Sequence, residues 1–207
     1  MILFDYWRSS ASYRVRIGLN LLGLRYESRP VDLLSGLQRS EENLARNPQG
    51  LVPTLAIDGV EITQSLAILE YLNETRSAGW LPVDVTGRAK VRALSYAIAM
   101  EIHPICNLRV ARYAVSLGGT TIDNWMKHFI EEGVADFEAM LASGSGSWYC
   151  HGSSVSLADI CLVPQIYNAR RWGVDMNRFP TTAAIASRLE VIPAFAAAHP
   201  DMARAQP

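Results

Sequence analysis

Cysteine is scarce in this sequence, and its few cysteines follow no recognisable pattern. The 207 residues include three, Cys106, Cys150 and Cys161, with neither a Cys-x-x-Cys pair nor the ligand spacing of a metal site. A chain of this length can bury a hydrophobic core without disulfide or metal support. We therefore expect reduced thiols and no bound metal, with a disulfide as the less favoured alternative.

Blocks of like charge and long apolar runs are absent as well. The 19 Lys and Arg residues nearly balance the 20 Asp and Glu residues, which leaves a net charge of −1 and no basic cluster that would attract nucleic acid. The first residues, Met1–Arg8, already contain charged side chains and do not start a long apolar segment. We therefore expect neither a signal peptide nor a membrane anchor, and a cytoplasmic location.

The most informative stretch runs from Asn47 to Tyr71. Thr54–Ile57 and Val60–Thr63 are short apolar-rich runs joined by Asp58-Gly59, a dipeptide typical of a two-residue hairpin turn. Two antiparallel strands are therefore predicted. Val52-Pro53 comes just before the first strand, and an X-Pro bond is the favoured place for a cis peptide.

A helix is predicted directly after this hairpin. Thr63-Gln64-Ser65 supplies capping residues in front of apolar positions with near-helical spacing. A helix N-terminus carries unpaired N–H groups and a partial positive charge. Gln64 and Ser65 therefore stand where a carboxylate can bind.

Residues 1–77 are predicted to form a thioredoxin-like domain. Strands are expected at Ile2–Tyr6 and Tyr26–Val31, and helices at Tyr13–Leu22 and Glu41–Arg46. The first two strands should be parallel because a helix connects them, whereas the hairpin strands are antiparallel. The resulting order, βαβαββα, is that of thioredoxin-like folds.

Serines occupy the position at which redox proteins of this fold carry Cys-x-x-Cys. The residues between the first strand and the first helix are Ser9-Ser10-Ala11-Ser12, so any thiol chemistry needs a thiol brought by a ligand. A hydroxyl at a helix start can donate to a thiolate, and the helix dipole favours the anion. Lowering a thiol pKa from about 8.5 to about 6.5 requires roughly 2.7 kcal/mol, which one or two charge-assisted hydrogen bonds supply. The alternative is that these serines only cap the helix.

The remainder of the chain is predicted to be helical. Residues 78–86 lose periodicity and form a linker, and residues 87–207 form an all-α domain. Turns are expected at Gly118-Gly119 and Ser143–Ser147, and a frayed tail at 201–207. Ser156 and Asp159 form a capping box, so Asp159 is given a folding role rather than a chemical one. The expected helices are Gly87–Leu117, Ile122–Leu141, Leu157–Trp172 and Thr182–Leu189, and a further apolar piece follows at Ala194–Ala198.

An ordered set of short motifs resembles the glutathione transferase family, and its zeta class in particular. The set consists of Arg8-Ser9-Ser10, Asn47-Pro48, Val52-Pro53, Gln64-Ser65 and His103-Pro104, and it spans half of the chain. The resemblance implies an α/β thioredoxin-like domain followed by an all-α domain, in a homodimer. The alternative for the hairpin region is an unrelated α/β domain in which Pro53 protects a strand edge.

The resemblance also implies a glutathione site. Ser9 or Ser10 would hold the thiolate as the catalytic residue, and the peptide group of Val52 would pair with the tripeptide as another strand does. Tyr6 and Tyr13 are alternative thiolate donors, because other classes of the family use tyrosine. The glutathione-binding residues implied are Ser9, Gln38, Val52, Pro53, Gln64, Ser65, His103 and Asn107.

Two of these residues also have a purely local interpretation. His103 can satisfy a helix carbonyl that Pro104 leaves without its usual partner. Gln38 can serve only its own loop. Asn107 is expected one helical turn after His103, facing the same way.

Arg8, Arg109 and Arg171 are the residues expected to bind the substrate. The resemblance implies that their planar guanidinium groups hold the two carboxylates of a maleyl substrate in the cleft between the domains. The alternative for each is an exposed helix residue, as expected for Arg170. Many zeta members carry cysteine after the two serines, where this chain has Ala11, so that thiol is not essential to any activity of this chain.

The function implied is glutathione-dependent cis-trans isomerisation in the catabolism of aromatic compounds. A glutathione thiolate would add to the double bond of maleylpyruvate or maleylacetoacetate, the resulting single bond would rotate, and elimination would release the fumaryl product. The arginines would disperse the enolate charge. Two alternatives remain: a zeta-type transferase or dehalogenase that consumes glutathione, and a non-catalytic glutathione-binding protein of the same fold.

Overall fold

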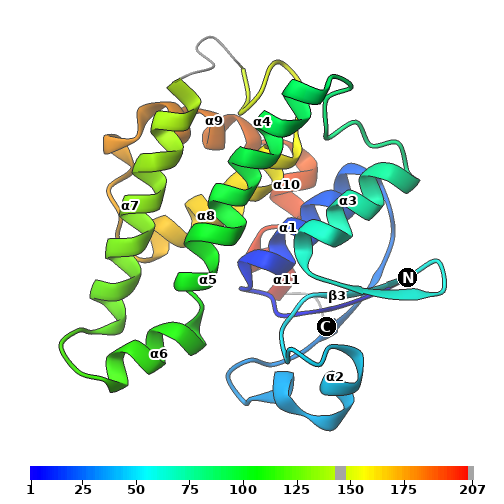
Figure 1. Ribbon diagram of the computed structural model, residues 1–207. Helices are drawn as coiled ribbons and strands as arrows, with labels where there is room; N and C mark the ends of the chain where they lie inside the picture. The colour runs from blue at the N-terminus through cyan, green and yellow to red at the C-terminus, as the bar shows by residue number, and fades with distance from the viewer. Residues whose placement is uncertain (143–147, 205–207) are drawn as a thin grey trace. The chain divides into compact units, whose positions relative to one another are not determined.

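The computed structural model describes residues 1–142 and 148–204 (Figure 1). The chain forms two compact units, one of Met1–Ala78 together with residues 192–204, the other of Gly79–Val191. The division puts the C-terminal helices with the first unit, whereas the sequence led us to group residues 87–207 in one helical domain. The turn expected at Ser143–Ser147 lies outside the described residues.

The first unit contains a four-stranded mixed sheet with the strand order β2-β1-β3-β4. Strand β1 is parallel to β2 and antiparallel to β3, which in turn pairs antiparallel with β4. At the hairpin turn Asp58 and Gly59 have φ angles of 51° and 81°, as a tight two-residue turn requires. The thioredoxin-like order is therefore confirmed. The strands are β1 Ile2–Asp5, β2 Glu27–Pro30, β3 Thr54–Ile57 and β4 Val60–Thr63.

Helices α1 and α3 pack against each other in this unit (Figure 1). Helix α1 starts before the predicted Tyr13 because Ser9 caps it. A short helix, α11, replaces the frayed tail predicted from residue 201 up to Arg204. The helices are α1 Ser10–Leu21, α2 Glu41–Arg46, α3 Ser65–Thr75, α10 Pro193–Ala197 and α11 Pro200–Arg204, with a 3-10 turn at Leu37–Arg39.

Among its described residues, the second unit contains helices and no strands. Gly118 and Gly119 form the expected turn, both with positive φ, between α6 and α7. Among the described residues of the chain, none of the helices combines the length and apolar character needed to cross a membrane. The helices are α4 Val85–Tyr96, the π-helix η2 Ala97–Ile102, α5 His103–Ile105, α6 Leu108–Ser116, α7 Ile122–Ala142, α8 Leu157–Arg171, the 3-10 helix η3 Met176–Arg178 and α9 Pro180–Glu190.

The single helix predicted for Gly87–Leu117 was wrong, because the chain becomes a π-helix before His103 and is interrupted at Cys106 and Asn107. Pro104 has no N–H to donate, and the chain before it widens into the π-helix η2. The helix then ends, and Asn107 caps the next helix by accepting a hydrogen bond from the N–H of Arg109 at 3.0 Å. Asn107 therefore does not continue the helix of His103.

The capping box at the start of α8 is present as predicted. Asp159 is fully buried and accepts hydrogen bonds from the N–H and hydroxyl of Ser156 at 2.8 and 2.6 Å, and from the N–H of Cys150 at 2.9 Å. Burial raises the pKa of this carboxyl, and the hydrogen bonds from Cys150 and Ser156 partly offset the rise. The hydrogen bonds that Asp159 accepts come from Ser156 and Cys150, so its role is structural.

Candidate active site

Ser9 lies between the end of β1 and the first turn of α1. Its backbone angles, φ −67° and ψ 122°, make it the N-cap, and its Oγ accepts a hydrogen bond from the N–H of Ser12 at 3.3 Å. Because the oxygen acts as the acceptor in that bond, the hydroxyl proton remains available for donation. Capping of the helix and stabilisation of a thiolate are therefore compatible roles for Ser9.

The two serines that follow differ in their surroundings. Ser10 is the first residue of α1 and is 9% exposed, and no other described residue forms a hydrogen bond with its hydroxyl. Ser12 is completely buried, and its Oγ accepts from the N–H of Tyr6 at 3.5 Å. Ser12 thus serves the fold, whereas Ser9 and Ser10 both keep a hydroxyl that can donate.

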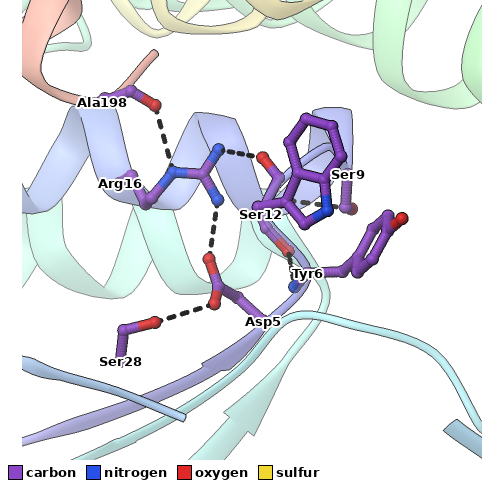
Figure 2. A network of polar contacts seen from close by, with 8 residues as sticks. Asp5, Tyr6, Ser9, Ser12, Arg16, Ser28 and Ala198 are labelled. Carbon is purple, nitrogen blue, oxygen red and sulfur yellow. Dashed lines mark hydrogen bonds and ion pairs between the residues drawn. The ribbon is translucent and has the colours of Figure 1, made fainter. Parts of the chain in front are cut away.

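A buried ion pair fixes the turn that leads into these serines (Figure 2). Arg16 of α1 donates to Asp5 at the end of β1 at 2.6 Å, and the two side chains are only 3% and 4% exposed. The second oxygen of Asp5 accepts from the hydroxyl of Ser28 at 3.0 Å. Arg16 also donates to the carbonyl oxygens of Trp7 at 2.8 Å and Ala198 at 3.1 Å.

This network of Asp5, Arg16 and Ser28 was not recognised in the sequence. A buried ion pair is tolerated only when its remaining donors and acceptors are also satisfied, and here the main chain of Trp7 and Ala198 does so. The available signal was the charge of Arg16 between Val15 and Ile17, both completely buried in α1. This signal does not identify Ala198 as a hydrogen-bond partner, because Ala198 lies 182 residues away in the sequence.

Gln64 and Ser65 stand at the start of α3, as predicted. Gln64 has a φ of 68°, which is rare for a residue other than glycine, and its amide donates to Gln49 Oε1 at 2.7 Å. Neither side chain caps the helix as expected, since Gln64 makes no capping hydrogen bond and Ser65 Oγ instead accepts from Arg14 of α1 at 3.2 Å. Backbone strain of this kind is concentrated at functional sites.

The loop before β3 is held in place by Asn47. This residue is 2% exposed, donates to the carbonyl of Leu51 at 3.0 Å and accepts from the N–H of Gln49 at 3.1 Å. The loop leads into the Val52-Pro53 bond, which is cis as expected.

Gln38 lies in the 3-10 turn before α2. Its carbonyl accepts from the Asn43 amide at 3.0 Å, which fastens the turn to α2. Its side-chain Oε1 is buried and has no hydrogen-bond partner among the described residues. A buried acceptor without a partner is uncommon and suggests a missing donor.

The remaining candidates belong to the second unit, apart from Arg8, which is half-buried in the turn between β1 and α1. His103 is half-buried in α5, and Arg109 is exposed in the first turn of α6. Arg171 is the last residue of α8, exposed, with its guanidinium 4.6 Å from the Trp172 ring. Its neighbour Arg170 pairs with Glu190 at the surface, as expected.

The cysteines are poor candidates for a nucleophile. All three are free, and burial raises the pKa of the Cys106 thiol to about 12. Burial, and then the charge of Asp159, raise the pKa of Cys150 well above its ordinary value. Cys161 is completely buried. Within the described part of the chain there is also no group of three or more His, Cys, Asp or Glu residues that would hold a metal ion.

Comparison with known proteins agrees with the fold. Residues 1–74 match the model of the glutathione S-transferase N-terminal domain. A maleylacetoacetate isomerase of Rhizobium meliloti is 56% identical over 207 residues, covering 98% of this chain and 97% of the relative. The chain therefore belongs to the glutathione S-transferase family.

Solved structures place it more narrowly, in the zeta class. A maleylpyruvate isomerase described as a bacterial zeta-class glutathione S-transferase, in its holo form, is 37% identical, with a TM-score of 0.94 and coverage of 100% of this chain and 99% of that one. A maleylacetoacetate isomerase from Methylobacterium extorquens AM1, with bound malonate and glutathione, is 36% identical, with a TM-score of 0.93 and coverage of 100% and 98%.

Proposed function

We propose that this protein is a glutathione-dependent cis-trans isomerase that converts maleylpyruvate or maleylacetoacetate to its fumaryl isomer. The observation that carries the proposal is the helix start after β1, where the Ser9 hydroxyl caps α1 and still keeps a proton to donate. The Cys106 and Cys150 thiols, whose pKa values burial raises, cannot serve as the thiolate at neutral pH. The isomerase relatives described above support the same activity.

Residues of the first unit fit a bound glutathione. Gln38 has a buried acceptor and Ser10 a hydroxyl, neither of which has a partner among the described residues, and Gln64 is strained at a helix start. Gln64 and Ser65 would receive a carboxylate at the N-terminus of α3, which favours anions. Val52 and Pro53 would bind the tripeptide main chain, and Ser9 or Ser10 would donate to the sulfur. When bound, glutathione supplies a thiolate that adds to the substrate double bond and is later eliminated unchanged.

The arginines would bind the substrate. Arg8, Arg109 and Arg171 each carry a planar guanidinium that suits a carboxylate, and the substrate has two carboxylates. His103 and Asn107 would assist in binding glutathione, although the Asn107 side chain also caps α6. The proposal includes a cytoplasmic homodimer that acts in the catabolism of aromatic compounds.

An ultraviolet assay of both maleyl acids, with and without glutathione, tests the proposal. We expect turnover only in the presence of glutathione, with the thiol concentration constant at the end of the reaction. Arg171→Ala should raise the substrate KM by roughly ten- to hundredfold, the value of a charge-assisted hydrogen bond. Arg170→Ala is the matched control, because Arg170 pairs with Glu190 at the surface. Unchanged rates in thiol-free buffer would refute the proposal, and consumption of glutathione would favour the transferase.

Separate substitution of the two serines identifies the thiolate donor. Ser9→Ala and Ser10→Ala each remove one hydroxyl, but only Ser9→Ala also removes the cap of α1. The pKa of bound glutathione, followed by thiolate absorbance, should rise in the variant that lacks the donor. A rise in neither variant would direct attention to Tyr6 or Tyr13.

A further inference from the structure

A hollow of about 470 Å³ opens in the first unit at the ends of β1 and β2. Trp7 and Arg8, which follow β1, and Asp32, which follows β2, contribute to its lining. The helix α11 contributes Arg204, the last described residue of the chain. Residues almost 200 positions apart in the sequence thus line the same hollow.

Two guanidinium groups lie against the same ring in this hollow. The Arg8 and Arg204 carbons are 5.0 and 5.1 Å from the centre of the Trp7 ring. Neither arginine forms a hydrogen bond or ion pair with another residue of the described ranges 1–142 and 148–204. The ring faces orient both cations without using any of their N–H donors. Those donors therefore remain free for a ligand.

The charge of the hollow favours an anion. Asp32 is its acidic residue, and its carboxylate accepts from the N–H of Leu34 at 2.9 Å. That bond, with further ones from Ser35, lowers the Asp32 pKa, so the group stays ionised at neutral pH. Two positive charges against one negative charge leave the lining of the hollow net positive, and the two cations repel each other. A carboxylate between them would remove that repulsion.

We propose that Arg204 of α11 is a specificity-determining residue, which together with Arg8 binds a carboxylate of the dicarboxylic keto-acid substrate in this hollow. The inference rests on the proposed function for the identity of the substrate, and on the hollow for the chemistry. Guanidinium groups bind carboxylates through two parallel hydrogen bonds, and lysine cannot reproduce that geometry. A substrate with a single carboxylate would lose this contact.

Helix α11 is held near the end of β1 by contacts between α1 and the C-terminal segment. Arg16 donates to the carbonyl of Ala198 at 3.1 Å, and Asn20 to the carbonyl of Ala194 at 3.1 Å. The ring of His199 meets that of Tyr13 edge-on at 6.1 Å. Arg204 therefore projects from a fastened helix, which reduces the entropy lost when it binds a ligand.

Calorimetric titration of the full-length protein with malonate tests the inference without relying on turnover. Arg204→Gln should weaken malonate binding and raise the KM for the maleyl acid by roughly tenfold, and Arg204→Lys should lie between Gln and wild type. The KM for glutathione should change by less than about twofold, because the inference gives Arg204 a contact with the substrate carboxylate and none with glutathione. Arg25→Gln is the matched control, since Arg25 is an exposed arginine of the same unit that does not line the hollow.

The outcomes separate the two proposals. Wild-type malonate affinity in Arg204→Gln, or an equal loss in Arg25→Gln, would overturn the role of Arg204. A parallel rise in the KM for glutathione would also overturn it, because the defect would then lie in the fold. Weakened malonate binding in Arg204→Gln, with no isomerase activity in wild type, would support the dicarboxylate site and reject the proposed function.

Discussion

The buried pair of Arg16 and Asp5 offers the sharpest test of how the site is supported. Arg16→Ala removes a cation that donates to Asp5, to the carbonyl of Trp7 and to the carbonyl of Ala198. Asp5, whose side chain is 4% exposed, would keep only the hydroxyl of Ser28 among these partners. The substitution therefore leaves the buried Asp5 carboxylate without its counter-ion.

The magnitude follows from the burial of both partners. Breaking a buried ion pair by removing one member costs about 3–5 kcal/mol, because the remaining charge stays desolvated. The two lost main-chain contacts place the expected value toward the upper part of this range, at about 4 kcal/mol. That is a large share of the roughly 5–15 kcal/mol by which a folded protein is stable.

Urea denaturation of the full-length protein measures this effect. The midpoint for Arg16→Ala should fall well below that of wild type, while Arg25→Gln should change the free energy of unfolding by no more than about 0.5 kcal/mol. Hydrogen exchange should also accelerate in α10 and α11, because Arg16 no longer holds Ala198. The double variant Asp5→Val/Arg16→Met should recover more than half of the loss, since it removes both charges.

Two results would refute this reasoning. A loss of less than about 1 kcal/mol in Arg16→Ala would mean that the pair is worth no more than a surface ion pair. A double variant no more stable than Arg16→Ala would mean that the stranded charge of Asp5 is not the cause. In either case the network in Figure 2 would not be what supports the turn at Ser9.

Three further predictions concern the second unit. Asp159→Ala should destabilise the protein by roughly 3 kcal/mol in a thermal melt, because the N–H groups of Ser156 and Cys150 lose a buried acceptor; an unchanged melting temperature would contradict the structural role of Asp159. Burial raises the pKa of Glu138, but hydrogen bonds from Thr182 and Thr181 outweigh this effect and leave the pKa below its usual 4.5. Its contribution is therefore fully present above about pH 4.5 and is lost as the pH falls through the lowered folded pKa, so the stability difference between wild type and Glu138→Gln should shrink in acid; a difference that grows there would refute the sign. Gly133→Ala in α7 would place a methyl group on the side chain of the buried Ile102 in η2, and this overpacking, about 1–3 kcal/mol, should exceed the helix-propensity gain of about 1 kcal/mol. Adding Ile102→Ala should relieve the clash. A Gly133→Ala variant as stable as wild type would show that η2 can shift to make room for the methyl group.

The elements that the sequence predicted correctly depend on neighbours within a few residues. Strands β3 and β4 and helix α2 have the predicted ends, because Asp58-Gly59 and Asn47-Pro48 mark their boundaries locally. The cap of α1 by Ser9 and the capping box of Asp159 are likewise local, because each hydrogen bond joins residues three positions apart. The motifs that led to the family belong to the same category.

Tertiary contacts decided the rest. The partners of Arg16 and Asn20 in the C-terminal segment lie 182 and 174 residues away, and no local pattern specifies such a pairing. The π-helix before His103 depends on Pro104 and on packing against α7, so periodicity alone predicted one long helix. Tertiary packing likewise brings Arg204 and Arg8 to the ring of Trp7, although they lie far apart in the sequence. Spacing along the chain determined which elements form, whereas packing between distant segments determined which side chains meet.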